Sequence, residues 1–129
     1  MDSGLILFAH GARDPRWAEP FMRLRDKVRA RVEGIPVALA FLEHCPPSLV
    51  EAASAMAAQG VRTIRIVPMF FGRGGHLRED FPRQLEEVRA RLPDVQFEVT
   101  LAAGEDEEVL DTLAAFATEA PPQQYSSQS

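Results

Sequence analysis

Short apolar stretches alternate with amphipathic stretches along this chain, and this alternation constrains the fold more than any other feature. The first stretch, Leu5 to Ala9, is apolar at every position, which is typical of a parallel strand covered by helices on both sides. Strands are also predicted at 36–42 and at about 62–69. Across 95–101 apolar and polar residues alternate, which predicts a fourth, half-exposed strand.

Helices are predicted between and after these strands. Asp14 supplies an N-cap and Pro15 a first helical residue, while Ser48 and Glu51 form a capping box for a second helix. The first helix is expected to end near Gly34, the second at Gly60, the third at Pro93-Asp94, and the last to run from Glu105 to about Glu119. Apolar residues recur at helical spacing at Trp17, Phe21, Leu24 and Val28, and again at Leu85, Val88 and Leu92.

These elements predict an α/β fold, a three-layer arrangement in which helices flank a four-stranded, mainly parallel sheet. The order of the strands does not follow from the sequence. The length of 129 residues suits a single domain, expected at 1–120, followed by a polar, disordered tail at 121–129. Trp17, Phe21 and Phe97 are predicted to lie in the core.

Charge and cysteine content exclude several classes of protein. The net charge of −5 argues against nucleic acid or anionic lipid as the main partner. The single cysteine, Cys45, excludes an internal disulfide and a multi-thiolate zinc site, and it suits a reducing compartment. The apolar stretch 5–9 is too short to span a membrane and follows no basic segment. We therefore expect a cytoplasmic protein with no membrane partner.

All three histidines follow predicted strands. His10 comes after the first strand, His44 after the second, and His76 lies in a glycine-rich loop expected at Phe70 to Arg78 after the third. Because the carboxyl ends of parallel strands meet at one edge of a sheet, these side chains are predicted to share one rim, where ligands bind in such folds.

The residues at this rim suit a borderline divalent metal ion such as cobalt, nickel, iron or zinc. His10, His76 and Glu43 are the predicted ligands and catalytic residues, and this set leaves coordination positions open for a substrate. Glu43 and His44 are adjacent at a strand end and point to opposite faces, and Glu43 is taken as the inward one. Cys45 is given no role.

Other residues near the rim suit an anionic, partly apolar substrate. Arg13, Arg73 and Arg78 are predicted to bind its acid groups, and Phe70 and Phe71 to line an apolar cavity. The glycine-rich loop lacks the lysine and hydroxyl of a P-loop, and its spacing misses the dinucleotide fingerprint, so no nucleotide is expected.

Taken together, these motifs resemble the short, single-domain sirohydrochlorin chelatases of the class II chelatase superfamily. The resemblance covers nearly the whole ordered chain and rests on three groups of residues: His10 to Pro15; Phe41 to Glu43 with Pro47 to Leu49; and Val67 to Phe70 leading to Gly75 to Pro82.

The resemblance implies insertion of a divalent metal into sirohydrochlorin, with His10 and His76 as metal-binding histidines and Glu43 as the active-site glutamate. It also implies a homodimer, in which two short chains correspond to the halves of longer chelatases. Cobalt is the expected metal substrate, with ferrous iron and then nickel as alternatives. A noncatalytic metal or tetrapyrrole carrier and a plain interaction domain remain as other readings.

Overall fold

The computed structural model describes residues 2–72, 74 and 77–124. Four parallel strands form one sheet: β1 (Ser3–Ala9), β2 (Val37–Phe41), β3 (Thr63–Pro68) and β4 (Gln96–Val99). Their order is β2-β1-β3-β4, so β1 lies in the centre between the two strands that follow it in the chain.

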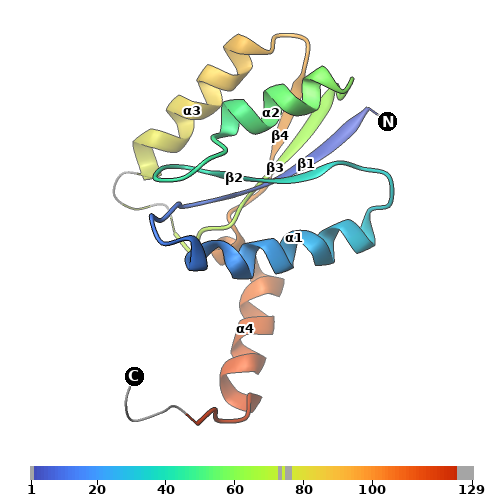
Figure 1. The fold of residues 1–129 in the computed structure, drawn as a ribbon. Helices are drawn as coiled ribbons and strands as arrows, with labels where there is room; N and C mark the ends of the chain where they lie inside the picture. Colours follow the sequence, from blue (N-terminus) through green and yellow to red (C-terminus); the bar gives the residue numbers. More distant parts are fainter. Residues whose placement is uncertain (1, 73, 75–76, 125–129) are drawn as a thin grey trace.

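Helices cover both faces of the sheet (Figure 1). The helices α2 (Leu49–Ala58) and α3 (Leu77–Arg91) pack on one face, where Ile6, Phe8 and Ile64 are fully buried. The helix α1 (Glu19–Arg31) packs on the other face, over Leu7 and Leu39. The three predicted layers are therefore confirmed, and every strand pair is parallel.

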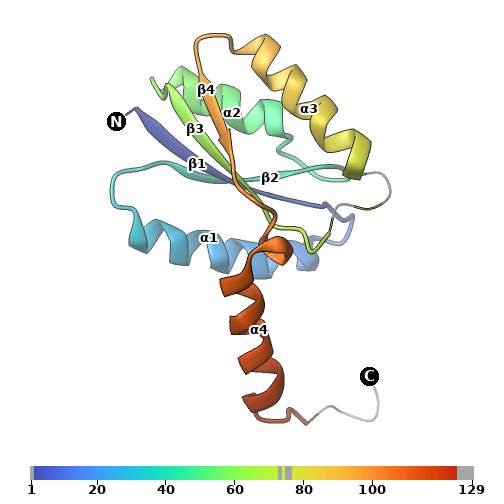
Figure 2. The ribbon, with the colours of Figure 1, turned by 180° about the vertical axis from the view of Figure 1, so that it is seen from behind.

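The last helix, α4 (Glu107–Glu119), is placed differently from the other three helices. It projects away from the sheet beyond α1, and both views agree on this (Figures 1 and 2). The part of the α1 face that lies over β3 and β4 carries the exposed ion pair Arg65–Glu98 at 3.8 Å. A helix has little apolar surface to cover there.

Several element boundaries differ from those predicted. Pro15 opens a short 3-10 turn (Pro15–Ala18) before α1, because Pro20 has no N–H with which to continue a helix from that turn. Asp14 does cap this turn by accepting from the N–H of Arg16 at 2.9 Å. The adjacent Arg16 guanidinium, more than that N–H, lowers the pKa of the Asp14 carboxyl.

The other differences concern α3, β4 and the core. Helix α3 begins at Leu77, inside the expected loop, because the Leu77 side chain is buried while Glu79 and Asp80 favour a helix N-terminus. Strand β4 stops at Val99, so Leu101 is exposed. Trp17 is exposed and Phe21 only half-buried, whereas Phe97 is buried as predicted.

The second predicted helix begins as expected. The Ser48–Glu51 capping box forms with bonds of 2.8 and 3.1 Å. A second short 3-10 turn, Ala103–Glu105, precedes α4, and Asp106 caps α4 by accepting from the N–H of Val109 at 3.1 Å. Within the described residues no helix is both long and apolar enough to cross a membrane.

Candidate active site

The carboxyl ends of β1 and β2 bring His10 and Glu43 together across 33 residues of sequence. The N–H of Leu42 donates to the carbonyl of Ala9 at 2.8 Å, which extends the strand pairing to the last residue before each side chain. His10 Nδ1 then lies 3.5 Å from Glu43 Oε1. The other carboxylate oxygen, Oε2, accepts the main-chain N–H of Gly11 at 3.2 Å. One carboxylate is thus held by two consecutive residues of the β1 exit.

Gly11 allows this close approach. A Cβ atom at this position would overlap the main-chain carbonyl oxygen of Glu43 and lie 3.1 Å from Cys45 Sγ. The two exits therefore touch backbone to backbone, and only a residue without a side chain fits between them.

Glu43, rather than His44, faces His10. The His44 side chain is exposed, and its φ of 73° turns the main chain sharply after Glu43. Cys45 is half-buried and packs beside the Leu7 and Phe41 cluster under α1, as a small core residue does.

The His10 ring packs against a cluster of three phenylalanine rings through Phe70. The His10 and Phe70 ring centroids are 4.7 Å apart in an edge-to-face arrangement. Phe70 in turn packs against Phe8 at 5.8 Å and Phe81 at 6.3 Å. Edge-to-face contacts of this kind restrict the orientation of both rings.

This cluster changes the expected contribution of the two phenylalanines. Phe70 is buried beneath His10, so it positions the imidazole and presents little surface to a ligand. Phe71 is 71% exposed and is free to contact an apolar ligand. The sequence analysis does not single out Phe81. Its contacts with Phe8 and Phe70 join a helix residue to residues at and after two strands, so they follow only from the fold.

Of the three predicted arginines, two lie in the described part of the chain. Arg13 is exposed just after the β1 exit. Arg78 lies in the first turn of α3 and lines a groove of about 600 Å³ together with Leu77, Phe81 and Pro82. Because Phe81 also belongs to the aromatic cluster, this groove adjoins the His10 side of the sheet. Arg73 and His76 lie outside the described residues.

We expect Arg78→Ala to raise the KM for an anionic substrate several-fold with little change in kcat. A surface arginine that contacts an acid group equally in the ground and transition states contributes to binding alone. Steady-state kinetics test this, with the exposed Arg89→Ala, on the last turn of the same helix, as the matched control. A fall confined to kcat would assign Arg78 a different role.

The structure describes two of the three metal ligands predicted from the sequence, His10 and Glu43. His10 and Glu43 are adjacent, and their side chains keep 50% and 39% of their exposure, so both are open to solvent. Among residues 2–72, 74 and 77–124 there is no cluster of three side chains able to hold a metal ion. A site with three ligands would need His76, the third predicted ligand, in addition to His10 and Glu43.

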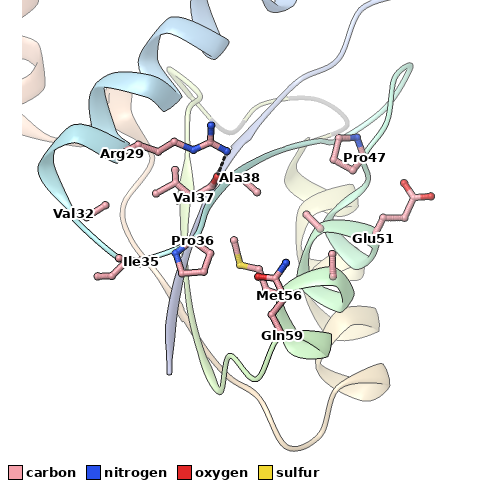
Figure 3. Close-up of a pocket in the computed structure, with 13 residues that line it drawn as sticks. Arg29, Val32, Ile35, Pro36, Val37, Ala38, Pro47, Glu51, Met56 and Gln59 are labelled. Atoms are coloured by element: carbon pink, nitrogen blue, oxygen red, sulfur yellow. Dashed lines mark hydrogen bonds between the residues drawn. The ribbon is translucent and has the colours of Figure 1, made fainter. Parts of the chain in front are cut away.

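A second groove of about 600 Å³ runs along the outer edge of β2, between α1 and α2, and contains none of the predicted site residues (Figure 3). Two hydrogen bonds in this region involve main-chain groups on the outer edge of β2. Arg29 Nη2 donates to the carbonyl of Val37 at 3.0 Å, and the N–H of Phe41 donates to the carbonyl of Pro47 at 2.9 Å. Main-chain groups at both ends of the edge strand are thereby satisfied, and the groove has no concentration of reactive groups.

The CbiX family model matches residues 4–120. The chain belongs to the CbiX family. Among curated relatives, the sirohydrochlorin cobaltochelatase of Sulfurisphaera tokodaii is 32% identical over 110 residues, which is 85% of this chain and 87% of the relative. The sirohydrochlorin cobaltochelatase of Saccharolobus solfataricus is 32% identical over 116 residues, 85% of this chain and 89% of the relative.

Solved structures show the same fold. A Marinobacter aquaeolei VT8 protein assigned to CbiX and to cobalamin (vitamin B12) biosynthesis superposes with a TM-score of 0.80 at 29% identity, covering 92% of this chain and 94% of that one. SirB from Bacillus subtilis with Fe3+ superposes with a TM-score of 0.74 at 24% identity, covering 94% of this chain and 49% of SirB. The CbiX chain thus spans about half the length of SirB.

Proposed function

We propose that this CbiX chain is a sirohydrochlorin chelatase that inserts cobalt into the macrocycle, a step of cobalamin biosynthesis. The observation that carries the proposal is the His10–Glu43 pair at the carboxyl edge of the sheet, in a chain whose curated relatives are named sirohydrochlorin cobaltochelatases. It is a metal chelatase, a lyase, and we place it in the cytoplasm.

The pair has the chemistry that metal insertion needs. Glu43 lies against Nδ1 of His10, and a neutral imidazole that donates from Nδ1 keeps its lone pair on Nε2. His10 Nε2 then binds the incoming divalent ion, with His76 as the second nitrogen ligand. Phe70 holds the imidazole ring in this orientation.

Proton removal is the second requirement. Two pyrrole N–H protons must leave the macrocycle as the metal ion enters it, so a proton acceptor has to lie beside the metal ligands. Glu43 is that acceptor, or it completes the coordination of the metal ion. Its second oxygen stays fixed by the Gly11 N–H while the first faces His10.

Substrate binding uses the surrounding rim. Sirohydrochlorin is an anionic tetrapyrrole, and Arg13, Arg73 and Arg78 supply positive charge to its acid groups. The exposed ring of Phe71 contacts the macrocycle. No nucleotide takes part.

We propose cobalt as the metal substrate because the curated relatives are named cobaltochelatases. The predicted ligands do not by themselves favour cobalt. Histidine and carboxylate ligands discriminate little among cobalt, ferrous iron and nickel. Insertion of ferrous iron, the siroheme reaction, is therefore the alternative activity, since the more distant SirB has been solved both with Fe3+ and with cobalt.

Anaerobic absorbance spectroscopy of sirohydrochlorin tests the proposal. We expect the purified chain to accelerate the spectral change with cobalt well above the uncatalysed rate, and less so with ferrous iron or nickel. Acceleration with iron alone would replace cobalamin by siroheme biosynthesis. Binding of the tetrapyrrole or metal without acceleration would make the chain a carrier instead.

The functional form that we propose is a homodimer. A compact chain of this length completes a cleft for a large macrocycle most simply by pairing with a second copy. The apolar side chains that α4 leaves exposed, Val109, Leu113 and Phe116, support this.

A further inference from the structure

The main chain that leads into Glu43 is held from two sides at Leu42. The N–H of Leu42 donates to the carbonyl of Ala9 at 2.8 Å, which ties it to β1. Its carbonyl accepts a hydrogen bond from Nε2 of Gln84 at 3.0 Å, and Gln84 lies on α3, 42 residues further along the chain. Both main-chain groups of Leu42 thus have partners, so the backbone of Glu43 starts from a fixed point.

Gln84 reaches this carbonyl from a groove of about 520 Å³ between α2 and α3, where its side chain is half-buried. The two helices lie side by side in both views (Figures 1 and 2). Two arginines line the same groove, but each pairs with an acid on its own helix. Arg83 binds Asp80 at 2.7 Å. Arg91 binds Glu87 at 3.3 Å. Within the described part of the chain, none of the predicted site residues lines this groove, so Gln84 acts on the rim through the main chain rather than by direct contact.

Helix α3 also contacts the other half of the pair at the rim. Phe81 packs against Phe70 at 6.3 Å between ring centroids, and Phe70 packs against His10 at 4.7 Å. Phe81 and Gln84 are three residues apart, so they are neighbours on one side of the helix. One side of α3 is therefore linked to His10 and to Glu43, in each case through one intermediate residue.

The contacts of the Glu43 carboxylate leave little room for displacement. Its Oε1 lies 3.5 Å from His10 Nδ1, and its Oε2 accepts the N–H of Gly11 at 3.2 Å. Both distances are at the long end of the range for hydrogen bonds, so a shift of a few tenths of an ångström would break them. Without the Gln84 amide, the Leu42 carbonyl would lose its partner and the main chain before Glu43 one of its two attachments.

We propose that Gln84 is a positioning residue for metal insertion, which holds Glu43 against His10 and Gly11 by binding the carbonyl of Leu42. This inference rests on the proposed chelatase activity. Gln84 acts through Glu43 and does not contact the macrocycle, so its loss lowers kcat and leaves the KM for sirohydrochlorin unchanged.

Two substitutions remove the hydrogen-bond donor. Gln84→Met keeps the length of the side chain, and Gln84→Glu keeps its shape but places a carboxylate against a carbonyl oxygen. We expect kcat to fall about 10-fold in the first variant and at least as much in the second, with KM within about twofold of the unchanged chain. Gln59→Met is the matched control, because Gln59 is exposed at the end of α2, at the opposite edge of the sheet.

Amide hydrogen exchange measured by NMR on the protein without metal or tetrapyrrole tests the same link independently of activity. The Gly11 N–H should exchange about 5-fold faster in both Gln84 variants, because the carboxylate that accepts it is no longer held in place. The N–H of Leu7, in the middle of β1, should exchange as in the unchanged chain.

Three results would overturn the positioning role. These are unchanged Gly11 exchange in the Gln84 variants, a rise in KM without a fall in kcat, and equally faster exchange at Gly11 and Leu7, which would indicate general destabilisation. A loss of turnover in Gln59→Met equal to that in Gln84→Met would also contradict it. If the unchanged chain inserted no metal while Gly11 exchange still responded to Gln84, the proposed function would fail and the link from Gln84 to Glu43 would stand.

Discussion

Replacing His10 by alanine is expected to abolish metal insertion and to leave the fold intact. In the mechanism that we propose, the substitution removes a nitrogen ligand of the metal ion, and it also removes the imidazole that lies 3.5 Å from Glu43 Oε1. Loss of a positioned ligand or proton-transfer partner lowers turnover on the order of 100-fold or more. The side chain is half exposed, so the free energy of unfolding should change by no more than about 1 kcal/mol. Turnover from sirohydrochlorin absorbance, beside a thermal melt, measures both quantities.

The neighbouring histidine provides the control. His44→Asn changes an exposed imidazole next to Glu43, and asparagine tolerates the left-handed backbone that His44 adopts at φ 73°. Turnover of this variant should stay near that of the unchanged chain. From the sequence resemblance, His76→Ala should lose turnover as His10→Ala does. Normal turnover in His10→Ala would remove His10 from the metal site.

A methyl group at Gly11 is expected to damage both the fold and the site. In Gly11→Ala the added Cβ overlaps the carbonyl of Glu43, a main-chain atom that cannot rotate away as a flexible side chain does. Forcing the two strand exits apart should cost about 1–3 kcal/mol of stability. Because the same shift moves the Glu43 carboxylate from His10, turnover should fall by about 100-fold.

Gly72→Ala is the matched control for this effect. Gly72 also lies in a loop near the rim, but nothing is within 4 Å of the position its Cβ would take. Denaturant unfolding and turnover of the two variants can be compared directly. Equal stability and equal activity would contradict the contact between the two exits.

The sequence predicts those parts of the structure that depend on local pattern. The apolar stretch before His10 and the Ser48–Glu51 capping box each act within a few residues, so they predict β1 and the start of α2 well. The placement of Glu43 follows from the same logic, because its strand and that of His10 end at one edge of a parallel sheet.

Features that depend on distant pairing are not predicted. The order β2-β1-β3-β4 leaves no local trace, and neither does the contact of His10 with Phe70, which lies after a different strand. The spacing of Val109, Leu113 and Phe116 indicates a helix with one apolar face. The spacing is the same whether that face packs on the chain's own sheet or on another molecule.

Two bonded main-chain groups on the outer edge of β2 bear on how such a chain avoids forming fibres. An open strand edge accepts a further strand, which presents a new edge in turn, so growth by this route has no natural end. Here Arg29 and Pro47 occupy main-chain groups at either end of β2, and the opposite edge strand, β4, is only four residues long. Strand-by-strand polymerisation is thereby disfavoured on both sides. The homodimer that we propose would associate through side-chain surfaces instead, and a closed twofold pair leaves no contact free for a third copy.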